Sequence, residues 1–185
     1  MLNLKLNRKM AQLALLQRIE LANPLLIKLR KIFGRHLFSK IFSKYFISVK
    51  EISKNYSARM EKELLTILPF LRQGQKILSI GSGLGGLEIG ILKKFNETDV
   101  TFLEKNYISN KIKYGWDNDN KEGYNDLSLL KNLIMMNKIS SERFSIFDCD
   151  KGSLPNKKYN LVISLYSLDY HYDFNIYLEY LKKST

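Results

Sequence analysis

KILSIGSGLGG, residues 76–86, is the stretch of sequence from which the fold can be read. Its first five residues form a short apolar run that suits a buried strand, and the glycines after it suit a tight turn. Apolar residues then recur at helical spacing from Leu87 to Leu92. Glycines between a strand and a helix let the backbone turn sharply and let a ligand approach main-chain N–H groups at the helix N-terminus. We therefore expect a ligand site at this turn.

Strand-like and helix-like segments alternate after the glycine turn. Further strands are expected at residues 99–104, 143–147 and 159–165, and helices at residues 127–136 and 176–181. Strands that alternate with helices predict a parallel sheet with helices on both faces. The expected fold class is α/β, with a parallel sheet of about four strands in residues 71–185.

Residues 1–70 read as an N-terminal helical region in front of the sheet domain. Apolar residues recur at helical spacing from Val49 to Ile67, and Ser48 with Glu51 fits a capping box at the start of this helix. In residues 37–46, pairs of apolar residues alternate with pairs of Ser and Lys, which predicts another amphipathic helix.

Positive charge is concentrated in the N-terminal region. The chain carries 30 Lys and Arg against 18 Asp and Glu, a net charge of +12. Residues 1–63 hold 14 of the basic residues and only four acidic ones, a net charge of +10. We expect Lys28, Lys31 and Arg35 to line one side of a helix, where they could meet an anionic membrane surface or nucleic acid phosphates. A solvated helix face is the alternative.

Composition excludes several classes of protein. With 45% hydrophobic and 26% charged residues, the chain has the composition of a folded domain rather than a disordered one. No stretch approaches the roughly 20 apolar residues that span a bilayer, so a cytoplasmic protein is expected, peripheral to a membrane if the basic helices bind lipid. Cys149 is the single cysteine, which excludes an internal disulfide. One cysteine and two distant histidines give no metal-ligand spacing, so no metal site is expected.

The glycine pattern fits two classes of cofactor. Gly81, Gly83 and Gly86 satisfy the GxGxxG pattern of dinucleotide-binding proteins, whereas GxGxG, with Gly85 in third place, is the pattern of methyltransferases that use S-adenosylmethionine. Glu104 ends the second expected strand, 21 residues after Gly83, where it could accept hydrogen bonds from ribose hydroxyls. Both cofactors carry such a ribose, so these features leave both open.

Residues 76–181 resemble the class I S-adenosylmethionine-dependent methyltransferases, whose fold is Rossmann-like. The resemblance is carried by the glycine turn, by Glu104 and by the step Phe147-Asp148-Cys149 after the third expected strand. A helical region before the first strand is also usual in that family. Nicotinamide-binding domains more often begin at the strand itself.

The resemblance implies a set of cofactor-binding residues. The candidates are Ser79, Gly81, Gly83, Gly85, Glu104, Asp148, Cys149 and Ser164. By their positions in the family pattern, the glycines would hold the methionine part of S-adenosylmethionine and Glu104 the ribose. Asp148 and the backbone of Cys149 would hold the adenine.

The chain departs from the family pattern in two places. Ser79 stands where the family usually has an acidic residue that helps to hold the amino acid end of the cofactor, so we expect part of the grip to come from Tyr56 or Arg59. The family fold also continues for three more strands. We therefore expect residues 159–165 to form a sheet edge covered by the last helix, the N-terminal helices or a second chain in an oligomer, and activity of this chain alone to be reduced.

Residues 164–172, which read SLYSLDYHY, are the expected place of substrate chemistry. They lack the Asp/Asn-Pro-Pro-aromatic and Pro-Cys motifs of enzymes that methylate nucleic acid bases, and they look more like small-molecule or sugar O-methyltransferases. His171 is the candidate general base because its pKa lies near working pH, and Asp169 is the next candidate. Trp116 is a candidate lid of the substrate pocket.

The expected function is methyl transfer from S-adenosylmethionine to an oxygen or nitrogen of a small molecule or sugar. One alternative is an NAD-dependent oxidoreductase, which the glycine pattern also fits. The other is a non-catalytic relative that binds the cofactor or a partner without turnover.

Overall fold

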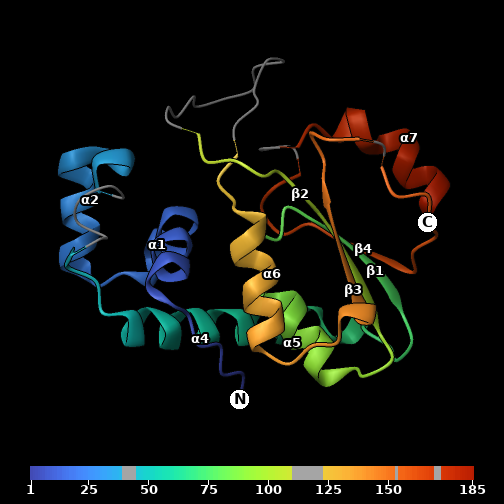
Figure 1. The fold of residues 1–185 in the computed structure, drawn as a ribbon, viewed down its shortest axis with the longest axis horizontal. Coiled ribbons are helices and arrows are strands. Elements are labelled where there is room, and N and C mark those ends of the chain that lie inside the picture. The colour runs from blue at the N-terminus through green and yellow to red at the C-terminus, as the bar shows by residue number, and fades with distance from the viewer. Residues whose placement is uncertain (39–44, 110–122, 153, 169–171) are drawn as a thin grey trace.

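A four-stranded parallel sheet lies at the centre of the molecule (Figure 1). The computed structural model describes residues 1–38, 45–109, 123–152, 154–168 and 172–185. The strands are β1 (Lys76–Ile80), β2 (Asp99–Glu104), β3 (Phe144–Asp148) and β4 (Leu161–Ile163), in the order β3-β2-β1-β4. The predicted α/β fold class is confirmed.

Helices precede, connect and follow these strands. They are α1 (Arg8–Gln17), α2 (Pro24–Leu37), α4 (Val49–Ile67), α5 (Gly86–Lys94), α6 (Leu127–Met136) and α7 (Phe174–Ser184). Short 3-10 turns are η1 (Ile19–Leu21), η3 (Leu68–Phe70) and η4 (Ser141–Arg143). Gly34 interrupts α2 with a φ of 75°, which produces a kink near its end. In the described part of the chain, no helix has both the length and the hydrophobicity to cross a membrane.

Different helices cover the two faces of the sheet. In β1, Ile77 belongs to the large core formed with α1, α4, α5 and α6, whereas Leu78 and Ile80 pack in a second core with Tyr177 of α7. This alternation follows from the two-residue period of a strand. Figure 1 shows α7 on one side of the sheet and α4, α5 and α6 on the other.

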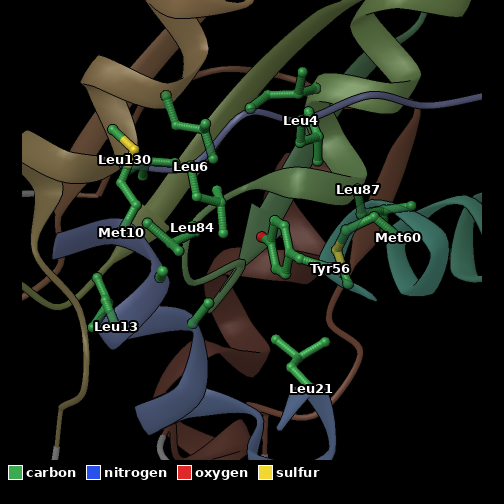
Figure 2. Close-up of a cluster of buried hydrophobic side chains, with 14 of the residues drawn as sticks. Leu4, Leu6, Met10, Leu13, Leu21, Tyr56, Met60, Leu84, Leu87 and Leu130 are labelled. Atoms are coloured by element: carbon green, nitrogen blue, oxygen red, sulfur yellow. The ribbon is translucent and has the colours of Figure 1, made fainter. Parts of the chain in front are cut away.

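The N-terminal region shares a core with the sheet. An extended segment before α1 lies along α4, where the backbone N–H groups of Leu4 and Leu6 donate to Ser57 Oγ (2.9 Å) and Ser53 Oγ (3.1 Å). The spacing matches because two extended residues rise about 6.6 Å and four helical residues about 6 Å. Leu4 and Leu6 then pack near Leu84 of the glycine turn (Figure 2). The segment before α1 therefore shares a core with the glycine turn.

Two predicted helix starts agree with the structure at a local cap, whereas α7 begins after its cap Asp173, two residues before the predicted start. The helix that begins after Ser48 is capped by the Ser48 hydroxyl, which accepts from Glu51 N (3.2 Å). Asp126 caps α6 by accepting from the backbone N–H groups of Ser128 and Leu129. Of the amphipathic helix predicted for residues 37–46, residues 39–44 lie outside the described part of the chain.

The fourth strand is shorter than the predicted range of residues 159–165. At one end, Tyr159 N donates to Ser184 O at the end of α7 (2.7 Å). At the other end, Ser164 Oγ accepts from Leu168 N (3.0 Å) in a turn. Both ends of the predicted segment therefore take part in other contacts. β4 lies at the edge of the sheet, as the sequence predicts.

Candidate functional site

A cavity of about 440 Å³ lies at the carboxyl ends of β1, β2 and β4, within the range of about 300–1,000 Å³ that is usual for small-molecule sites. The sheet side of its wall includes the glycine turn and the end of β2. Helices α1 and α4 provide the other side. Its wall includes Gln17, Arg18, Arg59, Ser79, Glu88 and Glu104.

Two glycines of the turn face this cavity and are crowded by other parts of the chain. Gly81 and Gly83 have φ angles of 68° and 65°, a region that side chains rarely adopt. A Cβ on Gly81 would lie 2.1 Å from Ser167 Cβ, and one on Gly83 would lie 2.6 Å from Gln17 Oε1. Gly85, at a φ of 70°, instead packs against Leu130 in the core. The turn therefore requires glycine for its own packing as well as for any ligand.

The N–H groups of the four turn glycines all donate within the protein. The pairs are Gly81 to Leu103 O (3.0 Å), Gly83 to Glu104 Oε1 (2.8 Å), Gly85 to Ser82 O (3.2 Å) and Gly86 to the Tyr56 hydroxyl (3.1 Å). Tyr56 was expected to help hold a cofactor. Its hydroxyl instead accepts from Gly86 N at the N-terminus of α5, and Tyr56 is not among the residues that line the cavity.

Glu104 is the central acceptor of the site. Its side chain is 2% exposed, and burial raises its pKa to about 7. Oε1 accepts from Ser82 Oγ (2.7 Å) and Gly83 N (2.8 Å). Oε2 accepts from Asn125 Nδ2 (3.1 Å) and the Tyr172 hydroxyl (3.2 Å). Glu104 therefore connects the glycine turn to two segments that are distant in sequence.

A second buried acid, Glu88, lines the cavity from the first turn of α5. Ser79 Oγ donates to its Oε1 (2.6 Å). The pKa of Glu88 is raised to about 7, mainly by burial; the Ser79 hydrogen bond and Arg18 act to lower it, and Glu63 acts to raise it. The glycine pattern does not indicate this residue; its place within the apolar run from Leu87 to Leu92 signals a buried charge but not its contact with Ser79.

Arg18, Arg30 and Arg59 line the cavity on the helical side. Arg18 forms a bidentate pair with Glu63, with N···O distances of 2.7 and 3.2 Å. Arg59 Nε donates to Glu63 Oε1 (2.9 Å), and Arg59 Nη2 donates to the Tyr166 hydroxyl (3.0 Å). Arg59, which the sequence analysis placed near the cofactor, does lie in the cavity wall.

The candidates from the third and fourth strands lie beside the cavity rather than in its described wall. Asp148 pairs with Glu104 in the sheet register and carries an ion pair to Lys151 (3.5 Å). Cys149 N donates to Glu104 O (2.7 Å), and burial raises the pKa of the thiol to about 12. Ser164 contacts its own turn.

Three further candidates, His171, Asp169 and Trp116, lie outside the described residues. The sequence analysis also missed Asn125, whose Nδ2 donates to Gly83 O (2.9 Å) as well as to Glu104. Across residues 1–38, 45–109, 123–152, 154–168 and 172–185, no three His, Cys, Asp or Glu side chains gather in a way that could hold a metal ion.

Comparison with known proteins adds no family to this description. No protein-family model matches the chain, and no curated protein matches it. The cavity offers the buried carboxylates of Glu88 and Glu104 on the sheet side, and three arginines with the buried carboxylate of Glu63 on the helical side. Such a site suits a ligand that carries positive charge and hydroxyl donors as well as an anionic group.

Proposed function

We propose that this chain binds S-adenosylmethionine in the cavity at the ends of β1, β2 and β4, and transfers its methyl group to an oxygen or nitrogen of a small molecule or sugar. The proposal is supported by the hydrogen bonds of the glycine turn: Gly83 N already donates to Glu104, and Gly86 N to the Tyr56 hydroxyl.

This arrangement disfavours a dinucleotide. A pyrophosphate is bound by N–H groups at the N-terminus of the helix that follows the glycine turn. In this chain the N–H groups of Gly83 and Gly86 already have acceptors within the protein. The carboxylates of Glu88 and Glu104 line the same cavity. A diphosphate would have to displace these hydrogen bonds and approach two acids. S-adenosylmethionine has no phosphate and carries a sulfonium cation, so it fits the same groups.

Different residues would bind the ribose and the adenine of S-adenosylmethionine. Glu104 would accept from the ribose hydroxyls through Oε2, where its hydrogen bonds from Asn125 and Tyr172 are longer than those on Oε1. The backbone N–H of Cys149 already donates to Glu104 O, so the carboxylate of Asp148 is left as the candidate partner of the adenine.

When bound, S-adenosylmethionine supplies a methyl group on a reactive sulfonium. The protein then has to align the acceptor with that methyl group and remove the acceptor's proton. We propose His171 as the base, with Asp169 as the alternative, because both follow the end of β4 in the sequence.

Glu104→Gln tests the proposal. The amide keeps an oxygen for Ser82 and Gly83 but removes the charge, and hydrogen bonds to charged groups contribute about 1.5–3 kcal/mol each against about 0.5–1.5 kcal/mol for neutral ones. We expect S-adenosylhomocysteine to bind about tenfold more weakly or worse in calorimetry.

Glu142→Gln is the matched control, since Glu142 is exposed in η4, just before the amino end of β3, and should leave the affinity unchanged. If a folded Glu104→Gln variant binds S-adenosylhomocysteine as tightly as the wild type does, Glu104 is not the ribose ligand.

A further inference from the structure

Glu88 carries a feature that folding alone does not explain. Its side chain is 3% exposed, and among the described residues its Oε2 atom has no hydrogen-bond partner. A buried carboxylate oxygen without a donor is costly, and such atoms usually mark a ligand, a water or a functional role. The other buried acids of the cavity, Glu104 and Glu63, have donors on both oxygens.

The position of Glu88 is fixed by its neighbours. The residue sits in the first turn of α5, where the positive end of the helix dipole favours a negative charge. Ser79 at the end of β1 donates to Oε1 (2.6 Å) and holds the carboxylate against the cavity. The unpartnered oxygen therefore belongs to a rigid part of the fold.

The helical side of the cavity offers the opposite charge. Arg18 and Arg59 both contact Oε1 of the single carboxylate of Glu63, and Arg59 uses its Nη2 on the neutral hydroxyl of Tyr166. Glu20 contacts Arg18 only at 3.8 Å and is half exposed. Arg30 also lines the cavity, which thus presents an acid with an unpartnered oxygen on one side and guanidinium groups, including those of Arg18 and Arg59, on the other.

We infer that Glu88 is the anchor for the ammonium group of an α-amino acid end of the ligand, and that Arg18 and Arg59 face its carboxylate. The inference rests on the proposed function, because S-adenosylmethionine carries such an end. It goes further by giving the charged end of the ligand a binding residue that the glycine pattern does not indicate.

Glu88→Gln separates this role from a purely structural one. Glutamine keeps the acceptor for Ser79 and nearly the same shape, but it loses the charge that attracts an ammonium group. Two ligands are titrated by calorimetry: S-adenosylhomocysteine, which has the amino acid end, and methylthioadenosine, which lacks it. We expect Glu88→Gln to bind S-adenosylhomocysteine about tenfold more weakly or worse and to bind methylthioadenosine as the wild type does. Glu142→Gln is again the control, with both affinities unchanged.

A second variant moves the carboxylate rather than removing it. Because Ser79 Oγ and Glu88 Oε1 are 2.6 Å apart, the double variant Ser79→Asp/Glu88→Gln places an acid on the other side of the same contact. We expect it to recover part of the affinity for S-adenosylhomocysteine that Glu88→Gln loses. A folded double variant that binds no more tightly than Glu88→Gln contradicts the inference.

The outcomes distinguish the inference from the proposed function. Equal affinity of S-adenosylhomocysteine for the wild type and Glu88→Gln, or an equal loss for both ligands, overturns the role of Glu88 and leaves the cofactor proposal standing. Absence of S-adenosylhomocysteine binding by the wild type overturns both.

Discussion

Glu88 and Glu104 are buried acids whose charge costs the folded state free energy. Burial is the main cause that raises the pKa of each from 4.5 to about 7. The Glu88 carboxylate also acts to raise the pKa of Glu104, and the Glu63 carboxylate acts to raise the pKa of Glu88. Glu88 is faced by Ser79 from β1, by Arg18, by Glu63 from α4 and by Glu104 from β2. Because the folded state holds these protons more tightly than the unfolded state, stability is highest below about pH 4.5 for these groups and falls as the pH rises to about 7.

The pH dependence of stability therefore reports on these acids. We expect each to lower the free energy of unfolding by up to about 3 kcal/mol between pH 4.5 and 7. Glu88→Gln removes one of the two titrations, so its urea unfolding curves at pH 5 and 7.5 should differ less than those of the wild type do. Equal differences in the two proteins would show that Glu88 titrates normally.

Of these two buried acids, the sequence predicts a site role for Glu104 at the end of β2 but not for Glu88 in α5. Glu104 is predictable because the distance from the glycine turn to the end of the next strand is nearly constant in this fold. Glu88 is not, because helical spacing does not tell which side chain meets the end of β1. Asn125 is missed for the same reason: its contact with Glu104 joins segments 21 residues apart through tertiary packing.

At the scale of elements, α2 presents an outer face without a described partner in this chain. Leu25 and Ile32 are 65% and 73% exposed and lie two turns apart. Lys28 and Lys31, between them in sequence, are also exposed. An apolar stripe flanked by lysines is typical of helices that lie on anionic membrane surfaces. We propose this surface as a membrane contact, separate from the cavity.

Vesicle cosedimentation tests this contact. We expect binding to vesicles that contain an anionic lipid, weaker binding at high salt because exposed charges are screened, and little binding to vesicles of neutral lipid. Lys28→Glu/Lys31→Glu should lose most of the binding, whereas Lys50→Glu/Lys54→Glu on α4 should retain most of it. No binding at low salt, or binding to nucleic acid instead, would contradict the membrane proposal.

The starts of two helices were predictable from residues that cap them. The caps Ser48 and Asp126 fix the starts of α4 and α6, so these helices follow directly from the sequence. The length of β4 cannot be predicted in this way, because Tyr159 N donates to Ser184 O at the end of α7 and does not extend the strand. The pattern of residues along a sequence does not specify which distant carbonyl group will accept a hydrogen bond from a given N–H group.

At the scale of the whole molecule, β4 leaves one edge of the sheet open within the described chain. Asn160 N donates to Lys76 O, so the two-residue period directs the N–H groups of Leu161 and Ile163 away from β1. Helix α7 covers a face of this strand, but its packing does not pair these groups. An unpaired edge favours association with a second copy.

We expect this edge to be covered by self-association. The amides of Leu161 and Ile163 should then exchange hydrogen slowly, with protection that increases with protein concentration, and light scattering should give a mass above that of one chain. Fast exchange of both amides in a monomer would mean that the edge is bare.

Calorimetry of the wild-type chain with S-adenosylhomocysteine and with NAD tests whether the glycine turn, with its N–H groups bound to Glu104 and Tyr56, accepts a cofactor without phosphates. We predict one S-adenosylhomocysteine bound per chain and no heat of binding for NAD under the same conditions. Binding of NAD without binding of S-adenosylhomocysteine would contradict the account.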